Sequence, residues 1–286
     1  MYSSKKIILT FDVETWNEGV WMKPFITKDL LNQNDFFRES IEVILSLLKN
    51  KDGHATFFVT DNVVKKYPDV VKKISDEGHE VGSHGVGHIK LTETNYSEYR
   101  ELFLSHIKDI ENITGKKVLG FRAPHFSLCE KSAWIVDLLE EAGLKYDSSA
   151  FPVPMGEYGS KKFPTKIYKI GRENIFQEKD KSPILEIPLS IYKTFIGNIP
   201  FAGGVYFRLL PICISKYILN RKIKSGNIPI IYFHPHELEN RTPQIKSGPY
   251  VKRKIKYWGV NNSLKKFEKM TDCYIFDSIE NTFLNQ

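Results

Sequence analysis

The run of residues 7–14, Ile-Ile-Leu-Thr-Phe-Asp-Val-Glu, passes directly from apolar side chains to two carboxylates. Residues 7–11 are typical of a buried strand that ends at Asp12. Asp12 and Glu14 lie two positions apart, so in an extended chain both side chains project to the same side. Two carboxylates held together at a strand end are costly unless a cation or an arginine compensates them. A solvated loop is the alternative interpretation.

Strands and helices alternate along the chain that follows. Further strands are predicted at residues 55–59, 80–82, 118–121, 184–187 and 229–233. Helices are predicted at residues 35–50, 68–78, 97–113 and 131–142. The alternation predicts an α/β fold with a mostly parallel sheet or barrel, in one domain spanning residues 1–286. Residues 150–182 are expected to form an irregular insertion, and residues from about 238 to 286 a C-terminal extension.

The composition limits the partners of the chain. The formal net charge is +7 and the pI is about 9.0. This positive charge is interpreted either as a contribution to solubility alone or as a means of attracting anionic lipid surfaces or acidic glycans. The lysines are scattered and no nucleic-acid motif is present, so we expect no nucleic-acid partner. Cys129, Cys213 and Cys273 are far apart and predict neither a disulfide framework nor a cysteine zinc site.

The apolar run at residues 7–9 is too short for the core of a signal peptide. No apolar stretch reaches the roughly 18 residues that span a bilayer. These two features predict a cytoplasmic protein, with peripheral contact with the inner membrane surface as an open alternative. The segment 207–224 mixes apolar and basic residues, and a helix of the barrel wall is favoured there over a membrane-surface helix.

His84 and His88 are four positions apart, just after the predicted strand at residues 80–82. On a helical turn this spacing presents both imidazoles to one ion. Together with a carboxylate from elsewhere, they would form a site with two histidines, one carboxylate and open positions. Such a site suits zinc or a similar divalent metal. The alternative is that the two histidines are unrelated loop residues.

Two more polar clusters follow predicted strands. Arg122 is held by a rigid proline turn and is placed to pair with Asp12, which would keep that carboxylate ionised. His125, in the same turn, is expected to be pocket wall or substrate contact. His234 follows the strand at residues 229–233 and is a candidate general acid, because imidazole titrates near working pH. A surface arginine and a structural histidine are the alternatives. In α/β barrels the loops after the strands share one face, so all these clusters can meet.

The order of these motifs is Thr-Phe-Asp, then His-x-x-x-His, then Arg-x-Pro, then a strand that ends in His. This order resembles the polysaccharide deacetylases of carbohydrate esterase family 4, the NodB-homology group. The segments 146–152, 201–211 and 232–237 are similar to a subgroup linked to bacterial exopolysaccharide and surface-polysaccharide loci. The resemblance covers about residues 7–283. It implies a distorted (β/α) barrel with fewer strands than the eightfold type, and a metal-dependent enzyme that releases acetate from an N-acetylated glycan or its lipid-linked precursor.

The resemblance also implies roles for individual residues. Asp12 would be the general base, Arg122 would orient it, and His234 would protonate the leaving amine. The ligands of a divalent metal, Zn²⁺ first among them, would be Glu14, His84 and His88. The residues expected to contact substrate are Pro124, His125, Phe126, Gly203, Gly204, Tyr206 and His236. A tight turn is the alternative for the glycine pair.

The sequence departs from the family pattern at two positions. Val13 stands where many members have a second, metal-binding aspartate, so Glu14 is expected to supply the third ligand. His236 stands where the subgroup has a bulky aromatic, and it is expected to shape a subsite. A catalytically inactive carbohydrate-binding homologue and a hydrolase of another non-peptide C–N bond remain alternatives. A serine hydrolase is disfavoured because no Gly-x-Ser-x-Gly elbow is present.

Overall fold

The first strand lies at the centre of the sheet. The computed structural model describes residues 5–19, 22–156, 158–195 and 197–284. Strand β1 (Lys6–Val13) pairs in parallel with β2 (Thr56–Val59) and with β11 (Ile230–Phe233). Its apolar residues are buried on both sides, as a central parallel strand requires.

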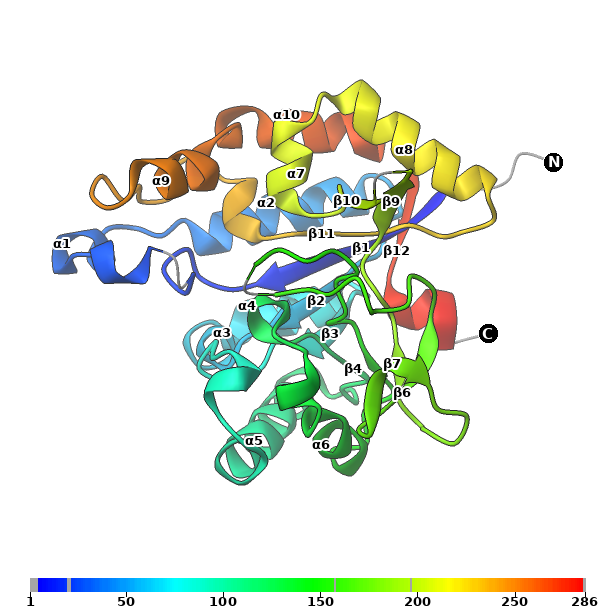
Figure 1. The fold of residues 1–286 in the computed structure, drawn as a ribbon. Helices are drawn as coiled ribbons and strands as arrows, with labels where there is room; N and C mark the ends of the chain where they lie inside the picture. Colours follow the sequence, from blue (N-terminus) through cyan, green and yellow to red (C-terminus); the bar gives the residue numbers. More distant parts are fainter. Residues whose placement is uncertain (1–4, 20–21, 157, 196, 285–286) are drawn as a thin grey trace.

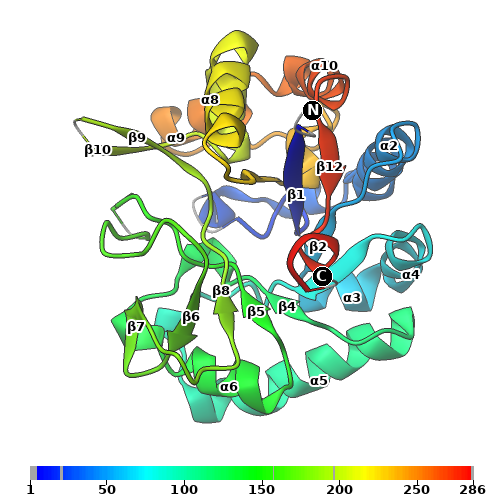
Figure 2. The ribbon, with the colours of Figure 1, turned by 90° about the vertical axis from the view of Figure 1, so that its right-hand side faces the viewer.

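The remaining strands continue this sheet around a common interior (Figure 2). The order is β11-β1-β2-β3-β4-β5-β8-β6-β7, with β12 also paired to β1. The parallel strands are β3 (Glu80–Ser83), β4 (Gly120–Phe121), β5 (Tyr146–Asp147) and β8 (Leu185–Glu186). The antiparallel strands at the end are β6 (Tyr168–Gly171) and β7 (Asn174–Glu178). The result is a distorted α/β barrel.

Helices cover the outside of the sheet (Figure 1). One group consists of α2 (Phe37–Lys49), α3 (Asp61–Lys66), α4 (Pro68–Asp76), α5 (Tyr96–Thr114) and α6 (Ile135–Glu141). A second group consists of α7 (Gly204–Leu209), α8 (Ile212–Lys224) and α10 (Val260–Thr271). Helix α2 buries Ile41, Ile44 and Leu48 on one face, which is the spacing of an amphipathic helix.

Two short helices lie toward the carboxyl end of β1 (Figure 1). They are α1 (Lys28–Leu31) and α9 (Tyr250–Tyr257). A separate hairpin is formed by β9 (Ile191–Thr194) and β10 (Gly197–Pro200). The remaining elements are the single turns η1 (Lys23–Phe25), η2 (Leu91–Glu93), η3 (Pro124–Phe126), η4 (Glu130–Ser132), η5 (Pro235–Glu237) and η6 (Glu280–Leu284).

The C-terminal part of the chain completes the sheet. Strand β12 (Ile275–Asp277) pairs in parallel with the start of β1, and the Phe276 carbonyl accepts a hydrogen bond of 3.0 Å from the His54 N–H, just before β2. Strand β12 therefore lies beside the first residues of β1 and next to the segment that leads into β2. The region beyond residue 238 was expected to be an extension, and the structure instead makes its last strand part of the sheet.

Most predicted elements are present, with shifted limits. The predicted helices at 35–50, 68–78 and 97–113 correspond to α2, α4 and α5. The helix expected at 131–142 is shorter, because residues 130–132 form the separate turn η4. The expectation of irregular structure over residues 150–182 was wrong in part, because the β6–β7 pair lies within it.

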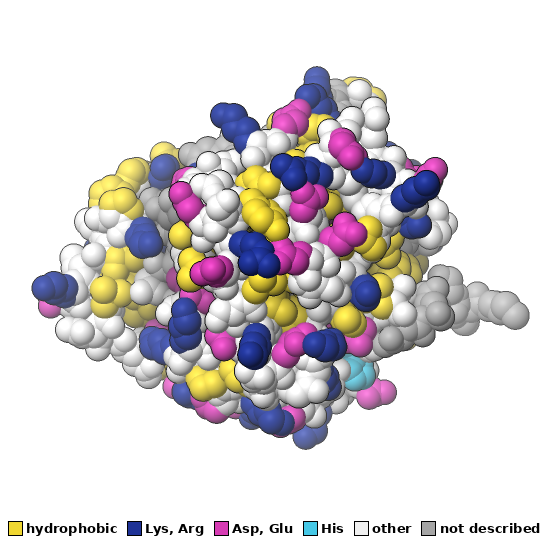
Figure 3. Space-filling view, turned by 90° about the horizontal axis from the view of Figure 1, so that it is seen from below, with side chains coloured by type: hydrophobic (Ala, Val, Ile, Leu, Met, Phe, Trp, Pro, Cys, Tyr) yellow, Lys and Arg dark blue, Asp and Glu magenta, His cyan; other side chains and the backbone are white. Residues whose placement is uncertain are grey.

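The segment 207–224 forms part of the barrel wall, which is the interpretation that the sequence favoured. Helix α8 buries Ser215, Ile218 and Leu219 and leaves Ile214 and Tyr217 exposed. Within the described parts of the chain, none of the helices has the length and apolarity needed to cross a bilayer. The face over α5 and α6 carries basic and acidic side chains side by side (Figure 3), as in the ion pairs Arg100–Glu141 and Lys117–Glu111.

Candidate active site

The end of β1 delivers two carboxylates to one pocket of about 200 Å³. Asp12 is 2% exposed and Glu14 is 5% exposed, and both line this pocket. Val13, between them, is turned into the hydrophobic core. The alternation of a strand thus places Asp12 and Glu14 on the pocket side, and the missing second aspartate leaves no gap in the pocket wall.

Arg122 lies behind Asp12 and fixes it. Its Nη1 donates to Asp12 Oδ1 at 2.7 Å and to Thr10 Oγ1 at 2.8 Å. Its Nε and Nη2 donate to the carbonyl and hydroxyl of Ser148, each at 3.0 Å. The guanidinium also lies over the ring of Phe58, 4.4 Å from its centroid. With Arg122 fully buried, this network allows Asp12 little freedom to rotate.

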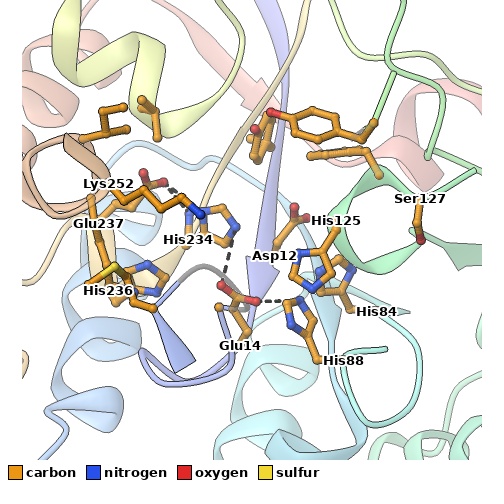
Figure 4. A pocket seen from close by; sticks show the side chains of 18 of the residues that line it. Asp12, Glu14, His84, His88, His125, Ser127, His234, His236, Glu237 and Lys252 are labelled. Atoms are coloured by element: carbon orange, nitrogen blue, oxygen red, sulfur yellow. Dashed lines mark hydrogen bonds and ion pairs between the residues drawn. The ribbon is translucent and has the colours of Figure 1, made fainter. Parts of the chain in front are cut away.

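Glu14, His84 and His88 form a compact cluster (Figure 4). One ligand atom from each lies within 4.8 Å of the others, and Glu14 Oε2 is 2.6 Å from His88 Nε2. The Nδ1 atoms are held from behind, that of His84 by the Arg122 carbonyl at 2.9 Å and that of His88 by the Glu18 carbonyl at 3.1 Å. A carbonyl only accepts, so Nδ1 donates in each ring and Nε2 is presented to the cluster.

The helical turn expected for His84 and His88 is absent. The segment is a loop in which Gly85, Gly87 and His88 have positive φ, with His88 at 47°. A non-glycine residue in this region is strained by about 1–3 kcal/mol. The loop nevertheless turns the two imidazoles together, with ring centroids 5.3 Å apart.

Burial and neighbouring charge set the protonation of the cluster. Burial lowers the pKa of His84 to about 4, so its imidazole is neutral at pH 7. Burial also opposes charge on Glu14 and His88, but their mutual attraction outweighs it. The pKa of Glu14 is consequently well below its usual value, and that of His88 is raised.

The three donors fit a divalent cation. Two imidazoles and one carboxylate form the donor set that zinc and similar metals take when open positions remain for reactants. Glu14 Oε2 is buried without a well-aligned hydrogen bond, and a buried carboxylate oxygen in that state calls for a further partner. Glu14, His84 and His88 would therefore hold such an ion.

His234 faces the cluster from the end of β11. Its Nε2 is 3.8 Å from Glu14 Oε1, and its Nδ1 is 3.1 Å from Glu237 Oε2. Glu237 is in turn paired with buried Arg208, whose Nη2 is 3.0 Å from Glu237 Oε1. Burial opposes charge on His234, but the hydrogen bond and charge of Glu237 raise its pKa to about 9. At neutral pH His234 is therefore able to give up a proton.

Sequence reasoning missed the supporting side chains of the pocket. Glu237 follows His234 by three positions, a spacing that places both on one turn and was available as a signal. No local pattern marked Arg208, Tyr158, Lys252 or Lys256, which come from separate segments and line the pocket with the predicted residues.

Three of the expected substrate contacts lie at the pocket. They are His125, Phe126 and His236. His125 and Phe126 both have positive φ, 57° and 51°, and the His125 ring lies edge-on to His88 with centroids 4.3 Å apart. Burial lowers the pKa of His125 and of His236 to about 3, so both are neutral at pH 7.

The other expected contacts do not line the pocket. They are Pro124, Gly203, Gly204 and Tyr206. A Cβ on Gly203 would lie 2.5 Å from the Tyr232 hydroxyl, and one on Gly204 would lie 1.7 Å from Glu237 Oε2. The glycine pair thus makes room for two side chains of the pocket, and Val205, the next residue, lines the pocket. The Tyr206 hydroxyl contacts the sulfur of Met155.

Comparison with known proteins agrees with this geometry. The chain is 28% identical over 117 residues to a peptidoglycan-N-acetylglucosamine deacetylase of Bacillus cereus, covering 37% of this chain and 42% of that protein. It is 28% identical over 150 residues to a peptidoglycan deacetylase of Helicobacter pylori, covering 51% and 50%. The chain therefore spans half or less of the length of these two relatives.

A solved structure shares the fold. It is a Mycobacterium smegmatis protein assigned as a polysaccharide deacetylase, with a TM-score of 0.57, 18% identity, and coverage of 95% of this chain and 85% of the other. A family described as a domain of unknown function, DUF3473, matches residues 148–284. The family described as polysaccharide deacetylase matches residues 2–147, half of the chain, and includes Asp12, Glu14, His84, His88 and Arg122. The chain belongs to the polysaccharide deacetylase family.

Proposed function

We propose that the protein is a divalent-metal-dependent deacetylase that hydrolyses the acetamide of an N-acetylated glycan and releases acetate. One observation carries the proposal. A carboxylate fixed by an arginine, a three-donor cluster for a metal and a protonated histidine all border one pocket. These are the parts that metal-assisted amide hydrolysis needs.

Asp12 acts as the general base. Its Oδ1 is held by Arg122, so its carboxylate is directed to the pocket that Glu14 and His84 also line. When bound, a divalent cation supplies Lewis acidity, which polarises a carbonyl and lowers the pKa of water. Asp12 removes the proton from the attacking water, and the rigid pairing with Arg122 keeps the orientation of the carboxylate unchanged during this step.

His234 acts as the general acid. Breaking the C–N bond of an acetamide requires a proton on the departing nitrogen, since an amide anion is a poor leaving group. His234 carries that proton at neutral pH because Glu237 stabilises the imidazolium. Glu237 itself is secured by Arg208, so the orientation of the imidazole is fixed as well.

For the substrate, we favour an N-acetylated bacterial surface glycan or its lipid-linked precursor, and Zn²⁺ as the metal. The subgroup resemblance of residues 201–211 and 232–237 supports the surface glycan. The relatives named peptidoglycan deacetylases support peptidoglycan as the other candidate. The donor set of two histidines and one carboxylate supports zinc.

Acetate release tests the proposal. The protein would be incubated with N-acetylglucosamine oligomers, peptidoglycan fragments and lipid-linked N-acetyl sugars, with added Zn²⁺ or with a chelator. We expect acetate from at least one substrate, its loss with the chelator and its return with excess metal. Tight binding of the glycans with no acetate from any metal-loaded sample would overturn the enzyme proposal in favour of an inactive carbohydrate-binding protein.

A further inference from the structure

Helix α9 brings two lysines to the pocket. Lys252, Ile255 and Lys256 line it together with the catalytic candidates. Figure 4 shows Lys252 pointing into the pocket on the side of His234 that is away from His84 and His88. Lys252 therefore lies near His234, the proposed donor of the proton to the departing nitrogen.

Each carboxylate of the pocket already lies beside a basic side chain of the site. Asp12 is paired with Arg122, Glu237 with Arg208 and Glu14 with His88. Among the residues that the structure describes, no carboxylate lies within ion-pair distance of Lys252 or Lys256. The two ammonium groups thus add positive charge to the pocket without a direct ion pair, and Glu14 and Glu237 act on Lys256 only from a greater distance.

Lys256 is held in place without a counter-ion. Its Nζ donates to the carbonyl of Trp16 at 3.1 Å, and the residue is half-buried. Withdrawing an ammonium from water is unfavourable unless an anion compensates it. A group that is held at this cost beside a reactive centre is a candidate for ligand binding.

The surrounding sequence strengthens this positive field. Between Phe201 and Phe267 the only acids are Glu237 and Glu239, and each is paired with an arginine. The face over α5 and α6 is different, because basic and acidic side chains alternate there (Figure 3). A pocket lined by uncompensated charge concentrates ligands of the opposite sign.

We infer that Lys252 and Lys256 form a subsite for an anionic group, a carboxylate or a phosphate, on the glycan next to the acetylated sugar. The inference rests on the proposed function, since it specifies the substrate class of the same pocket. A glycan is favoured over a membrane surface because both lysines line the pocket. The outward side chains of Tyr250, Val251 and Trp258 do not line it.

Three probes test the subsite. They are a chitin tetramer, which is neutral, a hyaluronan tetramer, which alternates N-acetylglucosamine with glucuronate, and UDP-N-acetylglucosamine, which carries phosphates. Dissociation constants would be measured by tryptophan fluorescence at low salt, before turnover, for the native protein, Lys252→Met and the double variant Lys252→Met/Lys256→Met. Lys254→Met is the matched control, because it removes the same charge from α9 outside the pocket.

We expect the native protein and Lys254→Met to bind one or both anionic probes about fivefold or more tightly than the chitin tetramer. This preference should fall in Lys252→Met and disappear in the double variant. Hyaluronan alone as the preferred probe would identify a carboxylate, and UDP-N-acetylglucosamine alone a phosphate. Since Lys252 is exposed, Lys252→Met also tests the subsite if the double variant fails to fold.

Equal affinity of the native protein for all three probes would overturn the inference, as would a preference that persists in the variants. Sedimentation with phosphatidylglycerol vesicles that depends on Lys252, without any glycan preference, would overturn it too and assign the lysines to a membrane. Acetate would be assayed in parallel with added Zn²⁺. Its absence from the chitin, peptidoglycan and lipid-linked substrates would refute the deacetylase proposal, independently of whether the anion preference is found.

Discussion

Arg122 Nη1 lies 2.7 Å from Asp12 Oδ1, and both side chains are almost completely buried. The carbonyl of the same arginine holds His84 Nδ1 at 2.9 Å. One residue therefore positions the proposed base with its side chain and a proposed metal ligand with its backbone. The relative position of these two functional groups is fixed by a single residue at the end of β4.

Replacing Asp12 by asparagine should remove most of the turnover. The amide oxygen of the introduced side chain can still accept from Arg122, but it cannot take a proton, so kcat should fall by about 10²- to 10⁴-fold. Bound zinc, measured by elemental analysis after dialysis, should remain as in the native protein. An Asp12→Asn protein that releases acetate at the native rate would rule out Asp12 as the base.

Zinc should stabilise the folded protein through the cluster of Glu14, His84 and His88. A ligand that binds only the folded state adds about 2.7 kcal/mol to the free energy of unfolding at a concentration of 100 Kd, so Zn²⁺ should raise Tm. His84→Ala should lose most of this increase. The control is His236→Ala, which removes a pocket histidine outside the cluster. An equal rise of Tm in the native protein and in His84→Ala would show that zinc binds elsewhere.

Glu237→Gln should shift the alkaline limit of activity. His234 is the proton donor in its charged form, so kcat/KM should fall as the pH rises through its pKa of about 9. Without the charge of Glu237 this pKa moves toward the ordinary histidine value of about 6.5. The alkaline limb of the kcat/KM profile should therefore shift to lower pH. The profile would be recorded from pH 5.5 to 10, with Tm confirming that the variant is folded. An unchanged limb would mean that another group controls the alkaline side.

Glu80 should make the protein less stable as the pH rises. This carboxyl is buried at the start of β3, where it is bonded to Thr56, Tyr146 and the Glu280 N–H. Burial raises its pKa from 4.5 to about 7, so between these values the folded state keeps a proton that the unfolded state has lost. The free energy of unfolding should therefore decrease by roughly 3 kcal/mol from pH 4.5 to above pH 7.

Urea unfolding of the native protein and of Glu80→Gln at pH 5, 6, 7 and 8 measures this effect. The pKa values of Asp147 and Glu186 are also raised by burial, so their contribution has the same sign. The free energy of unfolding of the native protein minus that of Glu80→Gln therefore isolates Glu80, and it should fall with increasing pH because only the native protein carries the titrating carboxyl. Parallel curves for the two proteins would assign the pH dependence to the other buried acids.

The sequence allowed the core of the site to be predicted because each of its motifs is short and follows a strand. Asp12 and Glu14 sit on one side of an extended segment, and the ends of parallel strands meet at one face. His84 and His88 do lie together, but not on the helical turn that their spacing predicted. A strained loop brings them together, and its glycines gave the only local hint of that conformation.

The remaining parts of the pocket depend on contacts that no local pattern encodes. Arg208 and Lys256 reach it from helices whose placement follows from packing over the whole barrel. Gly203 and Gly204 accommodate Tyr232 and Glu237, residues about 30 positions later in the chain, and nothing in the local sequence indicated this role. Such tertiary causes override what a short window of sequence can indicate.

The insertion of β12 beside β1 has a consequence for biosynthesis. Thr10 in the first strand bonds to Ile231, 221 positions away, and Ile7 pairs with Phe276. β1 is translated before β11 and β12, which follow it by more than 200 residues. Such long-range pairing slows folding, and until β11 and β12 have been made β1 can pair only with β2. We therefore expect the barrel to close late in folding, when β11 and β12 join β1.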